Sequence, residues 1–141
     1  MSHTYVLQLE VPGGLGPRAQ LDTSIHPPRV DVLHVIFDGW LGDQLVKSFP
    51  CHLVTANLAQ SLVSAGVTGF ELSEAEIEMS DQFREFYPTR TLPEFKWLKI
   101  TGTVGENDFF ITAANRLGVT RKALDVILAT APTELRFQAL Q

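Results

Sequence analysis

A pair of aspartates around a tryptophan is the first arrangement in the chain whose residue types could do chemistry. Asp38 and Asp43 enclose residues 39–42, in which Trp40 is the aromatic residue. Two carboxylates over an aromatic platform are typical of sites that bind or hydrolyse sugars. The same residues are typical of a turn, in which Asp and Gly satisfy local backbone geometry. We favour the turn. The alternative function is a small-molecule-binding protein or small hydrolase with a site near Asp38, Trp40, Asp43 and His52.

Cys51, the one cysteine of the chain, is followed directly by His52. A cysteine beside a histidine, here His52 or His34, can act as a nucleophile with its base. In the strand predicted for this segment, however, Cys51 and His52 point to opposite faces. We therefore interpret Cys51 as a small buried apolar residue, as most free cysteines are. A single cysteine also predicts a reducing compartment rather than a disulfide scaffold.

The other sequence signals of catalysis are missing. The chain contains no CxxC pair, no GxSxG elbow and no glycine-rich phosphate loop that opens a helix. The four histidines are scattered, and none pairs at the i,i+4 spacing of a helical metal site: His3, His26, His34 and His52. We expect no bound metal, no cofactor and no enzymatic activity.

The charge of the chain is concentrated in one acidic window. Between positions 71 and 85 there are six acidic residues and one basic residue, Arg84, so this window accounts for the whole net charge of −5. Such a run is typical of a solvated edge strand that resists aggregation. It also suits a surface that attracts a basic protein partner and speeds association with it.

An aromatic run overlaps the end of the acidic window and continues beyond it. Three of its residues are expected to fill the core: Phe83, Phe95 and Trp97. Phe86 and Tyr87 lie at the start of residues 86–94, which two prolines keep out of regular structure. Aromatic residues beside charge are typical of binding hot spots. The sequence therefore predicts a partner-binding surface made of Glu74, Glu76, Glu78, Asp81, Phe86, Tyr87 and Arg90.

Strand patterns outnumber helix patterns along the chain. Alternating apolar and polar residues predict strands at residues 4–11, 29–37, 70–79 and 95–104, and a hairpin of residues 109–112 with 117–119. In a regular strand over residues 70–79, the apolar Phe70 and Leu72 would point to the same face as three glutamates, Glu74, Glu76 and Glu78. One face cannot be both buried and acidic, so this strand requires a bulge near Ser73. Residues 12–28 hold four prolines and three glycines and are expected to form a loop or extended arm.

Two amphipathic helices are predicted, one after Thr55 and one after Thr120, and each threonine is a suitable N-cap. Their contexts match at an offset of 65 residues, as in Leu62-Val63 and Ile127-Leu128. Two interpretations stay open. The chain contains two degenerate β-α-β halves, or the match is one that any threonine-capped helix leading to a strand would give.

These elements predict a single α+β domain over residues 1–141, with a mainly antiparallel sheet and two principal helices packed on it. Hydrophobic residues make up 45% and charged residues 19% of the chain, which is globular composition. A net acidic chain without a basic patch is a poor binder of nucleic acid. Because the chain lacks a signal-peptide pattern and any apolar run near the roughly 20 residues of a membrane helix, we expect a cytoplasmic protein without membrane contact. A homo-oligomer built on an open sheet edge stays open.

The succession of several short segments resembles a known family. In chain order these segments are Leu53-Val54-Thr55, Gly66-Val67-Thr68-Gly69-Phe70-Glu71, Ser80-Asp81-Gln82-Phe83, Tyr87-Pro88, Leu92-Pro93-Glu94-Phe95-Lys96-Trp97-Leu98 and Gly105-Glu106-Asn107-Asp108-Phe109. They are similar to bacterial immunity proteins of polymorphic toxin systems, in particular a group first catalogued as a domain of unknown function. The similarity covers roughly residues 37 to 140 and does not extend to residues 1–28.

This resemblance implies a cytoplasmic inhibitor that binds a cognate toxin protein and neutralises it by protein–protein contact. The family supplies no functional residues that can be carried over to this sequence. The predicted contact surface therefore remains the set from Glu74 to Arg90 named above.

Overall fold

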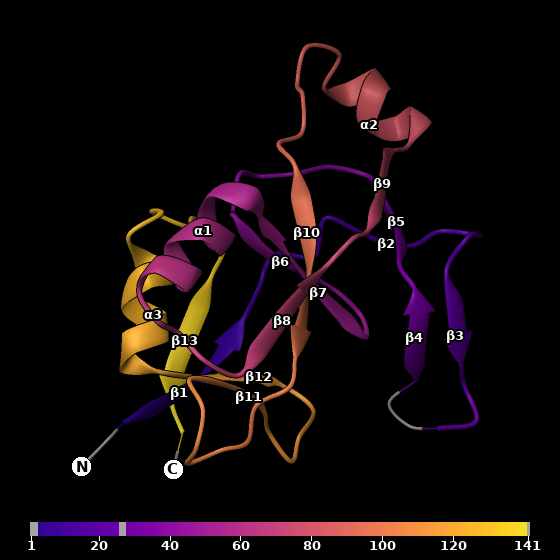
Figure 1. Ribbon diagram of the computed structural model, residues 1–141. Coiled ribbons are helices and arrows are strands. Elements are labelled where there is room, and N and C mark those ends of the chain that lie inside the picture. The colour runs from indigo at the N-terminus through magenta and orange to yellow at the C-terminus, as the bar shows by residue number, and fades with distance from the viewer. Residues whose placement is uncertain (1–2, 26–27, 141) are drawn as a thin grey trace.

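The computed structural model describes residues 3–25 and 28–140, in which two four-stranded sheets carry most of the fold (Figure 1). The strands of the first, sheet A, lie in the order β11 (Phe109–Ile111), β12 (Leu117–Thr120), β1 (Thr4–Gln8) and β13 (Arg136–Ala139). The strands of the second, sheet B, lie in the order β6 (Leu45–Ser48), β7 (Cys51–Thr55), β10 (Phe95–Ile100) and β8 (Phe70–Ser73). All neighbouring strands within these two sheets are antiparallel, so the predicted α+β class with a mainly antiparallel sheet is confirmed.

The two predicted helices pack on these sheets. Helix α1 (Ala56–Ser64) contacts β7 and β10, and helix α3 (Arg121–Leu128) contacts β12 and β1. The side-chain oxygen of Thr55 accepts the backbone N–H of Leu58 at 3.1 Å, and that of Thr120 accepts the N–H of Ala123 at 3.4 Å. Both threonines are therefore N-caps, as their positions predicted. The helices also contact each other, side by side at the left of Figure 1.

Sheets A and B repeat one arrangement at the offset of 65 residues found in the sequence. In each sheet a residue of the central strand pairs with two equivalent partners: Trp97 with Leu53 and Ser73 in sheet B, and Val6 with Gly118 and Gln138 in sheet A. Both flanking strands are hence in the same register in the two sheets. This register bears out the interpretation of the sequence as two degenerate halves.

The central strand of each sheet is exchanged between the halves. Strand β1 precedes the first half in the chain but lies between β12 and β13 of the second half. Strand β10 precedes the second half but lies between β7 and β8 of the first. Neither four-stranded sheet can therefore form from one half alone.

Two aspartates cross-link the halves in the same reciprocal way. Asp43 of the first half accepts the backbone N–H of Thr133 at 2.7 Å and its hydroxyl at 3.3 Å. Asp108 of the second half accepts the backbone N–H of Thr68 at 2.9 Å and its hydroxyl at 3.3 Å. The two pairs are related by the repeat offset, since Asp108 and Thr133 are equivalent to Asp43 and Thr68, so Asp43 makes a structural contact that the second half repeats.

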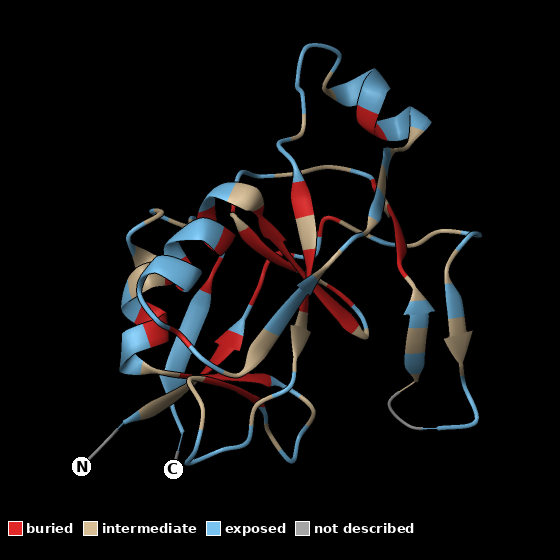
Figure 2. Ribbon diagram, in the orientation of Figure 1, coloured by how far each residue is buried: buried red, intermediate tan, exposed pale blue. Residues whose placement is uncertain are grey.

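Two apolar cores fill the molecule, on opposite faces of sheet B. Strands β6 and β7 of this sheet are almost entirely buried (Figure 2). The first lies between sheets A and B and the two helices, with Leu58, Leu62 and Leu124 among its fully buried side chains. The second contains all three aromatic residues predicted for the core, Phe83, Phe95 and Trp97. Burial of these faces is what fixes the pairing of helices and sheets.

Residues 12–28 are not simply a loop, which corrects the sequence prediction. They contain strand β2 (Gly13–Leu15), which pairs with β5 (His34–Phe37), and strand β3 (Gln20–Asp22), which pairs with β4 (Arg29–Val32). A Cβ atom at Gly13 would overlap the carbonyl of Ile36, and one at Gly16 would overlap the ring of His34. Gly13 hence permits close approach of two backbones, whereas Gly16 leaves room for the His34 ring and begins the turn that the N–H of Ala19 closes. Residues 26–27 of this segment lie outside the described residues.

The predicted strand at residues 70–79 is two strands in different sheets. After β8 the chain leaves sheet B, and β9 (Glu76–Met79) pairs in parallel with β5 in sheet C, whose order is β2-β5-β9. The alternation of side chains changes face near Ser73 because the strand ends there, and not because it contains a bulge. A short helix that the sequence analysis missed, α2 (Asp81–Phe86), follows directly. The strand predicted at 95–104 ends at Ile100.

Candidate functional site

The segment from Ser80 to Glu94, which we name the α2 arm, projects beyond the sheets at the top of Figure 1. The hydroxyl of Ser80 accepts the backbone N–H of Phe83 at 3.1 Å and so caps α2. Phe83 is fully buried in the second core, and its ring packs against Tyr87 with centroids 5.5 Å apart. The arm is therefore anchored from behind by one buried ring.

The outer face of the α2 arm is exposed. Phe86, three residues after the anchor Phe83, is 66% exposed. Asp81 is fully exposed, and Arg84 lies 3.6 Å from it on the same helix. A surface ion pair of this kind contributes little to stability. It does not cover the Phe86 ring, which is left exposed to solvent.

A cleft of about 530 Å³, which we name the arm cleft, lies beneath the arm. Its walls come from the loop after β1, the loop after β5, the arm and the loop before β13: Gln8, Leu9, Glu10, Val11, Pro12, Asp38, Gly39, Trp40, Leu41, Tyr87 and Glu134. The Arg90 guanidinium donates to the Trp40 carbonyl and lies 5.1 Å from the centre of the Tyr87 ring. The structure thus unites Tyr87 and Arg90 with Asp38 and Trp40, which the sequence assigned to separate candidate sites.

Carboxylates and aromatic rings dominate the chemistry of the arm cleft. Glu10 is only 7% exposed and accepts the backbone N–H groups of Leu41 at 2.6 Å and Asp43 at 3.3 Å. Burial raises the pKa of the Glu10 carboxyl, although these two N–H groups oppose the rise. Asp38 and Glu134 add two exposed carboxylates to the lining. With Trp40 and Tyr87 beside them, this arrangement suits a cationic group such as an Arg or Lys side chain.

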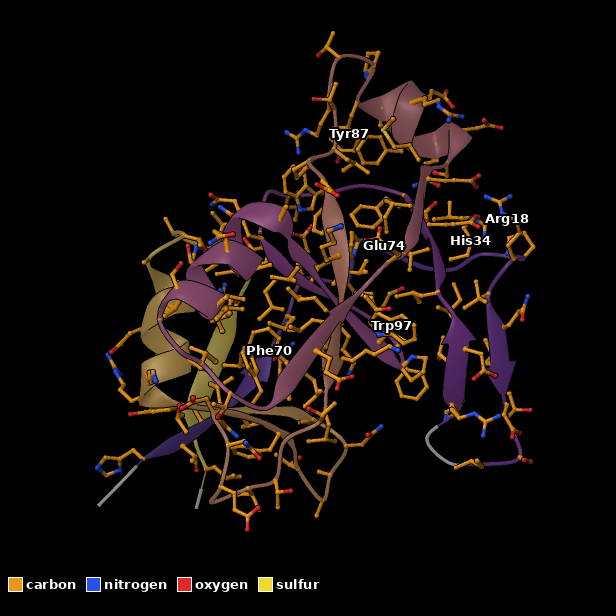
Figure 3. All side chains as sticks on the ribbon, in the orientation of Figure 1. Arg18, His34, Phe70, Glu74, Tyr87 and Trp97 are labelled. Atoms are coloured by element: carbon orange, nitrogen blue, oxygen red, sulfur yellow. The ribbon has the colours of Figure 1, made fainter. Side chains whose placement is uncertain are left out.

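The predicted acidic residues outside the arm are held in ion pairs. Arg18 contacts Glu76 and Glu78 at 2.6 Å each, and the buried His34 lies 3.1 Å from Glu78 (Figure 3). The Arg18 guanidinium holds the pKa of Glu78 below its usual range, with His34 contributing in the same sense. Arg18 lies in the segment expected to be a loop, so sequence reasoning had no way to place it here.

Glu74 is likewise paired, with the Lys96 ammonium 2.8 Å from its carboxylate (Figure 3). The seven predicted contact residues are thus divided. Glu74, Glu76 and Glu78 face basic residues of the same chain, whereas Asp81, Phe86, Tyr87 and Arg90 belong to the α2 arm.

The residues of the alternative hydrolytic site are not gathered. Asp38 and Trp40 line the arm cleft, but Asp43 is 1% exposed, and its two oxygens accept the N–H groups of Thr133 and Glu134. His52 lines a different pocket. Asp43 therefore acts as a structural acceptor, and the arm cleft retains Asp38 without the partner carboxylate that the sequence offered.

Cys51 is buried in the second core, and burial raises the pKa of its thiol to about 12. A thiol in this state is a poor nucleophile. Among residues 3–25 and 28–140, no group of three or more His, Cys, Asp and Glu side chains is placed to hold a metal ion. In the same part of the chain, no helix has the length and apolar character needed to cross a membrane.

No known family model matches this sequence, and no curated protein matches it either.

Proposed function

We propose that this protein is a cytoplasmic inhibitor that binds a cognate bacterial toxin domain and neutralises it by protein–protein contact. The proposal of a toxin as the partner rests on the resemblance of residues 37–140 to immunity proteins. The single observation that carries the contact surface is Phe86, which is 66% exposed on an element that Phe83 anchors from behind.

An anchored arm with an exposed aromatic tip has the physical properties of a binding element. Aromatic side chains dominate binding hot spots because they bury much apolar area at a low cost in side-chain entropy. The Phe83 anchor, the Ser80 cap and the hydrogen bond from Arg90 to Trp40 hold the arm before any partner arrives. A contact element ordered in advance loses less conformational freedom on binding.

The charge around the arm favours a basic partner surface. Asp81 and Glu85 are exposed on α2, and Asp38 and Glu134 are exposed in the arm cleft. A lysine or arginine of the partner can enter between these carboxylates and contact the Trp40 and Tyr87 rings. The acidic surface would also steer a basic partner and raise the association rate at low salt.

The first experiment is capture of the partner from the native host with the tagged full chain, followed by binding kinetics with the purified pair. We expect Phe86→Ala to weaken affinity by about 2 kcal/mol, which is roughly thirtyfold, because it truncates the exposed anchor. Val63→Ala is the matched control, since Val63 is 56% exposed on α1 and lies outside the arm.

Two outcomes would contradict this assignment. If Phe86→Ala binds the captured partner as tightly as the unmodified chain does, the arm is not the contact element. If the captured partner is active in the presence of stoichiometric amounts of this protein, the proposed inhibition is wrong even where the arm makes the contact.

A further inference from the structure

A second pocket, separate from the arm cleft, lies between the turns of two equivalent hairpins. It has a volume of about 610 Å³. Its walls come from the β6–β7 turn and the β11–β12 turn: Lys47, Phe49, Pro50, His52, Ile111, Thr112, Ala113, Ala114 and Asn115. We name it the hairpin pocket. A smaller pocket of about 190 Å³ adjoins it and shares the wall formed by Pro50, His52 and Ile111.

His52 is the unexplained group of the hairpin pocket. It is only 5% exposed, and its Nε2 is buried with no hydrogen-bond partner among the described residues. A buried polar nitrogen without a partner is costly, and most such atoms in folded proteins have one. His52 therefore has one hydrogen bond that the described residues leave unmet, at an atom that solvent does not reach.

The position equivalent to His52 in the second half of the chain holds an apolar residue. At the repeat offset of 65, His52 corresponds to Leu117, which is buried. In the first half Lys47 pairs with His52 across the hairpin, and in the second half Ile111 pairs with Leu117. The fold thus accepts an apolar pair here, so packing alone does not require the Lys47 and His52 pair.

The electrostatics of the hairpin pocket favour an anion. Among the described residues that line the pocket, Lys47 is the one charged side chain and none carries a carboxylate. Its ammonium lies 5.8 Å from the centre of the Phe49 ring, which also lines the pocket. Burial lowers the pKa of His52 to about 4, and the Lys47 charge adds to the effect, so the imidazole is neutral near pH 7.

We propose that the hairpin pocket binds a small carboxylate with an apolar tail, as a ligand site independent of the partner contact. The carboxylate would pair with the Lys47 ammonium, and it would accept a hydrogen bond from the His52 imidazole if the ring turns Nε2 toward the pocket. The tail would contact Phe49, Pro50 and Ile111, of which Phe49 and Ile111 are large exposed apolar residues. Apolar walls with a few convergent polar groups are typical of small-molecule sites.

Hexanoate is the probe, titrated into the intact protein while the ring nitrogens of His52 are followed by NMR. We expect a saturable shift of these signals, and binding of hexanol, which has the same tail without the charge, at least about tenfold weaker. We expect Lys47→Met to weaken hexanoate binding by at least about tenfold. Lys122→Met is the matched control, since this lysine lies on α3 and does not line the pocket.

His52→Leu restores the residue type of the equivalent position in the second half. We expect this variant to lose hexanoate binding and to unfold at a higher temperature, because it removes the unpaired nitrogen. The proposal is overturned if hexanoate gives no saturable shift up to about 10 mM, if hexanol binds equally well, or if Lys47→Met leaves binding unchanged. None of these results depends on whether the α2 arm binds a toxin.

Discussion

Asp43, Glu10 and His52 are buried polar side chains that differ in how their hydrogen bonds are met. Asp43 accepts hydrogen bonds with both oxygens, and Glu10 accepts two backbone N–H groups. The Nε2 of His52 has no hydrogen-bond partner in the described part of the chain. Because an unmet hydrogen bond costs more than a met one contributes, substitution of these residues is expected to change stability in opposite directions.

The pH dependence of stability is expected to report on His52. Its pKa is about 4 in the folded chain against 6.5 for a free histidine, so the unfolded chain binds the extra proton first as pH falls. The free energy of unfolding therefore falls between about pH 6.5 and pH 4, by roughly 3 kcal/mol in total. Urea unfolding of the unmodified chain and of His52→Leu at several pH values measures this difference.

Protonation of carboxylates also changes stability at acid pH, but it is common to both chains. In His52→Leu the fall in the free energy of unfolding at acid pH should be smaller, and the difference should equal the contribution of His52. Parallel stability curves for the two proteins between about pH 7 and pH 4 would show that His52 does not titrate in the way its burial implies.

Asp43 provides a second prediction at the residue scale. Asp43→Asn replaces one acceptor oxygen by a donor, so one of the N–H groups of Thr133 or Glu134 loses its partner. We expect a loss of about 1–3 kcal/mol in the free energy of unfolding. Asp38→Asn, at an exposed position on the same loop, is the control and should stay within about 0.5 kcal/mol. Equal, small losses for both variants would contradict the structural role of Asp43.

At the scale of elements, local sequence signals predicted the helices, whereas tertiary contacts determined where strands begin, end and pair. The capped helices α1 and α3 begin after the threonines that predicted them, because capping and amphipathic spacing are local properties. Residues 70–79 were predicted as one strand but serve two sheets, since the partner strands β10 and β5 are distant in sequence. Strand β2 was missed because glycine and proline usually mark loops.

The two helix caps should be energetically equivalent if the halves are true repeats. We expect Thr55→Ala and Thr120→Ala each to lower the free energy of unfolding by about 1–2 kcal/mol, because each removes the cap contact and the hydrogen bond that the hydroxyl donates to Gln44 or Asp108. Replacement by serine keeps the hydroxyl and is the control in both cases. A large loss at one cap with none at the other, measured by urea unfolding, would count against the equivalence of the two helices.

At the scale of the whole molecule, the exchange of β1 and β10 makes each sheet depend on both halves of the chain. Residues distant in sequence therefore form the centre of each sheet. The long-range pairs Asp43–Thr133 and Asp108–Thr68 reinforce the same dependence. We expect folding to be cooperative across the entire chain, without an independently stable half.

Cutting the chain in the α2 arm tests this dependence. Residues 1–90 and 91–141 each contain the central strand of the other fragment's large sheet, so we expect neither to unfold cooperatively alone. When mixed, the fragments should associate one to one and recover the circular dichroism spectrum and a thermal transition. A cooperative transition of either fragment by itself would contradict the structural role of the exchanged strands.

The sequence by itself determined the α+β class, the two capped helices, three aromatic core residues and the repeat offset of 65. These are local properties, or matches between local patterns, which the order of residue types already contains. It also placed Phe86, Tyr87 and Arg90 together, since they are neighbours in the chain.

Only the tertiary structure decided which strands pair, where Arg18 neutralises Glu76 and Glu78, and that Tyr87 and Trp40 line the same cleft. It also distinguished His52, with an unpaired nitrogen, from Asp43, which is fully hydrogen-bonded. The physical reason is that burial and hydrogen bonding depend on which distant segments meet. Which segments come into contact depends on the burial of the apolar faces of whole sheets and helices, and not on any single stretch of sequence.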